Sequence, residues 1–149
     1  MSKAGSSPHA SDRAKRRRLA AEQRAHSARV LVCECREDGS TPLHAVVRGL
    51  GYEALPCASL ADALRESTRA PFDIVISYMP TVTPEQASLL QLLRRGLGSA
   101  PLVIVSEDGS LEARTRCQPA RPYYFAVPPV SEAELRAILS GALEVARRG

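Results

Sequence analysis

Five short apolar runs recur along the chain from residue 28 onward, at intervals of about 21 to 28 residues. This interval is close to the length of one strand–helix unit, which is about 30 residues. Three of the runs are continuously apolar rather than alternating, which is typical of strands buried on both faces of a parallel sheet. The five predicted strands are Val30–Cys33, Tyr52–Cys57, Ile74–Tyr78, Leu102–Val105 and Tyr123–Val127.

Helix start signals lie between these runs. Thr83, Pro84 and Gln86 form a complete capping box, and Ser131 with Glu134 forms another. Further start or stop signals are Thr41-Pro42, Ser59 with Asp62, Gly51, and Pro119 at the end of a weak helix. The final helix carries one apolar stripe of Leu135, Ile138, Leu139, Ala142 and Ala146. The alternation predicts an α/β fold, a three-layer doubly wound five-stranded parallel sheet of order 2-1-3-4-5.

The charge is distributed unevenly. Of the 149 residues, 20 are Lys or Arg and 16 are Asp or Glu, a net charge of +4. Residues 1–27 hold seven of the cations and two of the acids, so the remainder has thirteen against fourteen, or −1. We therefore separate a basic tail over residues 1–27, disordered or marginally helical between Ser11 and His26, from a nearly neutral domain over residues 28–149. No lysine occurs after Lys15.

Several classes of protein are disfavoured. No apolar run approaches the roughly 18 residues of a membrane span, and the N-terminus lacks the apolar core of a secretory signal. We therefore expect a cytoplasmic protein whose four cysteines are free thiols. Cys33, Cys35 and Cys57 permit a metal or redox role, which we disfavour because no second tight pair or suitably spaced histidines accompany them. No catalytic arrangement is present, so an enzyme is not expected.

Four motifs in order resemble the response-regulator receiver (CheY-like) domain, over roughly residues 28 to 147. RVLVCE resembles its first strand, DIVISYMP the third, PLVIVS the fourth and YYFAVPP the fifth. The resemblance implies the flavodoxin-like receiver fold and a role in two-component signalling. In such domains an aspartate after the third strand is phosphorylated. Two acids hold Mg²⁺ there, a lysine pairs with the phosphoryl group, and a Ser or Thr and an aromatic residue change position.

The chemical site of that family is degenerate here. Glu34 matches the first acid, but Cys35 occupies the place of the second, and a thiol is a poor magnesium ligand. The acceptor position falls on Tyr78 by strand register, or next to Ser77 if the alignment has a gap there. Val127 replaces the lysine, whereas Ser106, Tyr124 and Pro128 match the family. We interpret the domain as a pseudo-receiver without metal or cofactor. Tyr78 would fill the vacated pocket, with its hydroxyl reaching water or Ser106.

We therefore expect a phosphorylation-independent module that binds another protein or a second copy of itself. The corresponding partner face of receivers comprises residues 110–120, 123–127 and 131–148. Tyr124 would lie near its centre, with Arg114, Arg116 and Arg121 as anchors.

Two alternatives stay open at this stage. One is a phosphotransfer receiver that uses Glu34 as metal ligand and Asp38 or Asp108 as acceptor. The other concerns the tail motif of Lys15, Arg16, Arg17 and Arg18. It could be a solubilising arm, or it could bind an acidic protein, a nucleic acid or an anionic membrane.

Overall fold

The computed structural model describes residues 9–34 and 42–148. Five parallel strands form one sheet of order β2-β1-β3-β4-β5, which confirms the predicted fold class and strand order. The strands are β1 (Arg29–Glu34), β2 (Glu53–Cys57), β3 (Ile74–Met79), β4 (Leu102–Ser106) and β5 (Tyr124–Ala126). The helices are α1 (His9–Ser27), α2 (Leu43–Gly49), α3 (Leu60–Arg69), α4 (Pro84–Leu97), α5 (Leu111–Cys117), the short 3₁₀ helix η1 (Gln118–Ala120) and α6 (Glu132–Arg148).

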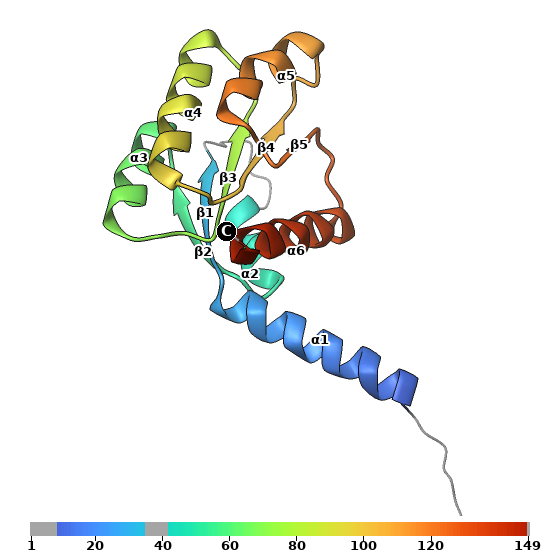
Figure 1. Ribbon diagram of the computed structural model, residues 1–149. Helices are drawn as coiled ribbons and strands as arrows, with labels where there is room; N and C mark the ends of the chain where they lie inside the picture. Colours follow the sequence, from blue (N-terminus) through green and yellow to red (C-terminus); the bar gives the residue numbers. More distant parts are fainter. Residues whose placement is uncertain (1–8, 35–41, 149) are drawn as a thin grey trace, which may run out of the picture.

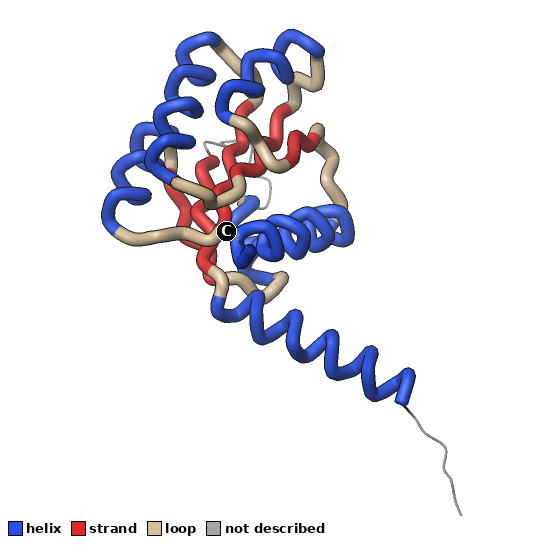
Figure 2. Tube along the Cα trace, in the orientation of Figure 1, coloured by secondary structure: helices blue, strands red, loops and turns tan. Residues whose placement is uncertain are grey.

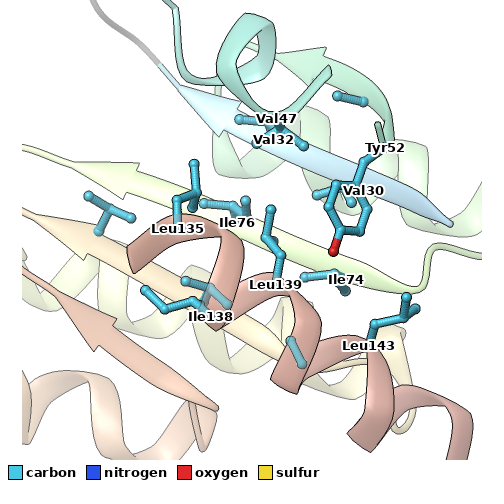
Figure 3. Close-up of a cluster of buried hydrophobic side chains, with 14 of the residues drawn as sticks. Val30, Val32, Val47, Tyr52, Ile74, Ile76, Leu135, Ile138, Leu139 and Leu143 are labelled. Carbon is cyan, nitrogen blue, oxygen red and sulfur yellow. The ribbon is translucent and has the colours of Figure 1, made fainter. Parts of the chain in front are cut away.

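Helices cover both faces of the sheet (Figure 2). An apolar cluster lies between the sheet and the helices on each face. Alternate side chains of each strand point to opposite faces. On one face Val30, Val32, Ile74 and Ile76 pack against α2 and α6, and Leu135, Ile138 and Leu139 complete the cluster (Figure 3). On the other face lie α3, α4 and α5, over a cluster that includes Leu31, Val75, Leu90, Leu102 and Ile104. All of β3 and β4 is buried, which explains their continuous apolar sequences.

The predicted helix starts agree with the observed caps at most positions. Thr83 and Gln86 make both bonds of the capping box. The Ser59, Ser110 and Ser131 hydroxyls each accept a bond from the N–H three residues later. At α2 the prediction is one residue out, because Pro42 is the capping residue and the helix starts at Leu43. Gly51 follows this helix with a φ of 99°, the left-handed conformation that stops a helix at little cost.

Helix α1 precedes the sheet and extends away from it (Figure 1). It begins at His9, two residues before the predicted cap Ser11, and every residue from Ala10 to Leu19 is exposed. Over the described residues, no helix is both long enough and apolar enough to span a bilayer.

Candidate functional site

The ends of β1, β3 and β4 bring the predicted site residues together. The register pairs Glu34 with Tyr78, Tyr78 with Val105, and Met79 with Ser106. In an open parallel sheet, the carboxyl ends of the strands on either side of the switch point are where ligands bind. The residues that sequence reasoning selected therefore occupy the place where a site is expected. Cys35 and Asp38 lie outside the described residues.

Glu34 is engaged at the start of helix α2. Its Oε1 accepts a hydrogen bond of 2.6 Å from the Leu43 backbone N–H. The first N–H groups of a helix lack partners within the helix, and a carboxylate is stabilised there by hydrogen bonding and by the helix dipole. Glu34 thus satisfies a backbone donor, a structural task that does not need a metal ion.

Tyr78, which the sequence analysis assigns to the acceptor position of receivers, is buried. Its side chain is 5% exposed and belongs to the cluster beneath α2 and α6. The hydroxyl donates a hydrogen bond of 2.5 Å to Oε1 of Glu107. The sequence analysis predicts water or Ser106 as a partner of this hydroxyl and does not single out Glu107. The signal was present in the sequence, because Glu107 directly follows β4 at the same sheet edge as Tyr78.

Ser106 and the following residues form a loop held by its own hydrogen bonds. The buried Ser106 Oγ accepts from the Asp108 N–H at 3.1 Å, and Asp108 Oδ1 accepts from the Ser110 N–H at 3.0 Å. Hydrogen bonds from Ser110 lower the pKa of Asp108, with a smaller contribution from Arg116. Asp108, the alternative acceptor, is therefore a loop-stabilising residue in this structure.

Val127, which the sequence analysis predicts to replace the lysine of receivers, packs on this loop. A Cβ atom added to Gly109 would lie 2.9 Å from Val127 Cγ2, so the loop backbone and this side chain are closely apposed. Beside the same strand ends lies a cavity of about 360 Å³. Its lining is aliphatic or proline throughout: Leu43, Val46, Val105, Pro128, Pro129, Val130 and Leu135. The surface of this cavity is therefore apolar.

The described residues do not fit a magnesium ion. Mg²⁺ requires octahedral oxygen coordination, usually with one or two carboxylates. Here Glu34 accepts from the Leu43 N–H at the start of α2, Glu107 is bonded to Tyr78, and Tyr78 itself is a phenol. Within residues 9–34 and 42–148, no group of three or more His, Cys, Asp or Glu is arranged to hold a metal ion.

Two cysteines form an adjacent pair on the opposite face of the sheet. Cys33 of β1 is in register with Cys57 of β2 and with Ser77 of β3. Both thiols are free. A hydrogen bond from the Cys33 thiol lowers the pKa of Cys57, against opposing effects of burial, Asp62 and Glu66. The same interaction, together with burial, raises the pKa of Cys33. Cys57, which is only partly buried, is therefore the more acidic and more accessible thiol.

The predicted partner face combines exposed apolar side chains with three arginines, of which Arg114 and Arg116 contact other groups of the chain. Tyr124 is 41% exposed. The Arg114 guanidinium lies 4.6 Å from the Phe125 ring centroid, and Arg116 donates to the Val82 carbonyl at 2.9 Å. Arg121 is exposed, and its charge adds to burial in lowering the pKa of Arg94. Sequence reasoning missed Leu111, which is 81% exposed at the first position of α5, because a leucine in a helix is normally assigned to the core.

Solved structures that share this fold include receiver domains. The receiver domain of a sensor histidine kinase from Pseudomonas aeruginosa, solved with magnesium in its active-site cleft, is 21% identical with a TM-score of 0.68. The match covers 78% of this chain and 98% of that one. The receiver domain of an HD-domain protein from Pseudomonas fluorescens is 20% identical, with a TM-score of 0.72 and coverage of 82% and 98%.

A pilus assembly-related protein from Burkholderia pseudomallei is 15% identical, with a TM-score of 0.73 and coverage of 81% and 92%. No family model matches the sequence, and no curated protein matches it significantly. The chain therefore has the fold of CheY-like receiver domains, and the similarity extends over the α/β domain.

Proposed function

We propose that this chain is a receiver-like signalling module that is not phosphorylated and that acts by binding another protein. The observation that carries the proposal is the buried Tyr78, whose hydroxyl is bonded to Glu107 at the strand end where receivers carry the acceptor aspartate. A phenol cannot form the acyl phosphate that a carboxylate forms. With Val127 in place of lysine, β5 does not supply the cation that would pair with a phosphoryl group. The module acts in two-component signalling in the cytoplasm and does not catalyse a reaction.

The loop bonds support a module fixed in one arrangement. In a phosphorylated receiver the hydroxyl after the fourth strand would approach the phosphoryl group. Here the Ser106 hydroxyl accepts from the Asp108 N–H, and Val127 packs over Gly109. The same bonds disfavour a phosphotransfer role for Asp108, because its carboxylate accepts a hydrogen bond from the Ser110 backbone N–H. We infer that partner binding does not depend on a phosphodonor.

The binding face is formed by α5, β5 and α6. It exposes Leu111, Tyr123, Tyr124 and Val127 around the arginine-capped Phe125. Exposed aromatic side chains and arginine are enriched at the centres of protein interfaces. A protein partner docks there, or a second copy of the chain does so in a symmetric dimer.

The test is a reconstituted binding measurement with the full chain and a partner identified by capture. The double variant Leu111→Ser, Tyr124→Ala should weaken the affinity by about tenfold or more, since each change removes apolar area from the proposed interface. Leu92→Ser is the matched control, because Leu92 is 48% exposed on α4, outside this face. Sedimentation of the same variants reports on the dimer.

Two results would contradict the proposal. One is equal affinity of the double variant and the parent chain for the partner, together with unchanged self-association. The other is a change in affinity when Mg²⁺ and a small acyl phosphate are added, because a module without an acceptor has no response to them.

A further inference from the structure

Helix α1 carries the basic surplus of the chain on a part of the molecule that the α/β domain does not cover. It contains six cations and two acids, Asp12 and Glu22. Residues 10–19 are exposed, and the helix extends away from the sheet (Figure 1). A 19-residue helix is about 28 Å long at 1.5 Å per residue. The result is a free, rod-like surface of positive charge.

Three of the exposed arginines share one side of this rod. At 3.6 residues per turn, helical spacing places Arg13, Arg16 and Arg17 within an arc of about 100°, whereas Lys15 and Arg18 fall on the opposite side. Asp12 falls outside that arc. An arginine side chain presents a planar fork of donors that matches two oxygens of a phosphate. The spacing therefore forms a row of phosphate-binding groups along one face.

The domain does not neutralise this charge. Residues 28–149 sum to −1, and among the described acids several are already paired with arginines of the domain. These ion pairs join Glu53 with Arg29, Glu66 with Arg69, Glu112 with Arg116, Glu132 with Arg136, and Glu144 with Arg148. The unneutralised charge of α1 therefore favours an anionic ligand outside the chain.

The chemistry of the helix favours DNA over a membrane. A helix that lies on a bilayer buries an apolar face, but Leu19 is the single large aliphatic residue of α1. Duplex DNA carries one charge about every 1.7 Å, and its major groove, about 12 Å wide, is close to the diameter of an α-helix. We propose that α1 binds the phosphate backbone of double-stranded DNA through Arg13, Arg16 and Arg17, without reading its sequence.

The experiment is a fluorescence anisotropy titration of a labelled mixed-sequence DNA duplex with the full chain at several NaCl concentrations. Three phosphate contacts give a slope of log K against log salt of about −2.7, so affinity falls by about 40-fold between 50 and 200 mM. Arg13→Gln, Arg16→Gln, Arg17→Gln keeps good helix formers and should remove most of this slope. The control Arg65→Gln, Arg95→Gln, Arg136→Gln removes the same charge from exposed sites on α3, α4 and α6 and should leave the slope unchanged.

Each outcome decides the proposal. It is supported if the α1 variant alone loses affinity and slope, with circular dichroism showing unchanged helix content. It is overturned if the parent chain fails to bind the duplex at 50 mM NaCl, or if both triple variants lose affinity equally. It is also overturned if phosphatidylserine vesicles bind the parent chain more tightly than the duplex does. Partner capture by the α5–β5–α6 face is a separate measurement and does not depend on this result.

Discussion

Replacing Tyr78 with phenylalanine removes one hydroxyl from the centre of the candidate site and keeps the buried ring. The lost contact is the 2.5 Å bond to Glu107. Hydrogen bonds to charged groups contribute about 1.5–3 kcal/mol to stability. Glu107 is exposed, so water can replace the phenol as its hydrogen-bond partner. We therefore expect the free energy of unfolding to fall by about 1.5 kcal/mol, the lower end of this range. For a chain of this length this corresponds to a fall in Tm of about 4 °C. Tyr78→Ala, which also removes the ring, should cost about 3–5 kcal/mol.

A double-mutant cycle isolates the contact. Unfolding by urea is measured for the parent chain, Tyr78→Phe, Glu107→Ala and the combination. We expect a coupling energy of about 1 kcal/mol or more, so that Tyr78→Phe costs little once Glu107 is absent. Tyr124→Phe, which removes an exposed hydroxyl, serves as the control and should change stability by less than about 0.5 kcal/mol. A coupling energy indistinguishable from zero would refute the assignment of Tyr78 and Glu107 as a structural pair.

Three further predictions concern local structure. Thr83→Ala removes the capping-box acceptor of α4 and should lower the free energy of unfolding by about 1 kcal/mol in a urea titration, and an unchanged midpoint would contradict the cap. Peptide mapping after brief alkylation near neutral pH should find Cys57 modified before Cys33, since the pKa of Cys57 is lowered and that of Cys33 raised; the reverse order would refute this pairing. The lowered pKa of Asp108 stabilises the fold above its unfolded pKa of about 3.9, and this stabilisation is lost as pH falls through the folded pKa. Asp108→Asn should therefore lose less stability than the parent chain between pH 6 and pH 3, and an identical loss would count against the loop bonds.

The strand order could be predicted because each strand and helix is marked by residues that are close together in the sequence, and the same marks recur along the chain. β3 and β4 are buried on both faces, so their sequences lack polar alternation, and the serine and threonine caps mark most of the helix starts. The connection between successive parallel strands is then right-handed and short, which leaves few topologies. The start of α1 was less predictable, because an exposed helix has no buried face to fix its first residue.

The partners of the site residues were harder to predict than their positions. The register placed Tyr78 beside Glu34 as expected, but its bond to Glu107 depends on the course of a loop. Arg116 appeared as an interface anchor, and the structure shows it bonded to the Val82 carbonyl. From sequence alone, an arginine in a helix is predicted to be solvent-exposed. This prediction is the same whether or not a carbonyl of another loop lies close enough to accept a hydrogen bond from the guanidinium. Such contacts depend on the packing of elements that are distant in sequence.

The proposed function requires that the carboxyl ends of β1, β3 and β4 cannot accept a phosphoryl group. Intact-mass spectrometry of the full chain after incubation with Mg²⁺ and a small acyl phosphate tests this directly, with an ordinary receiver labelled in parallel as the positive control. We predict no species heavier by one phosphoryl group when that control is labelled. A phosphoryl adduct mapped to Asp108, to Tyr78 or to any residue at the ends of β1, β3 and β4 would contradict the account.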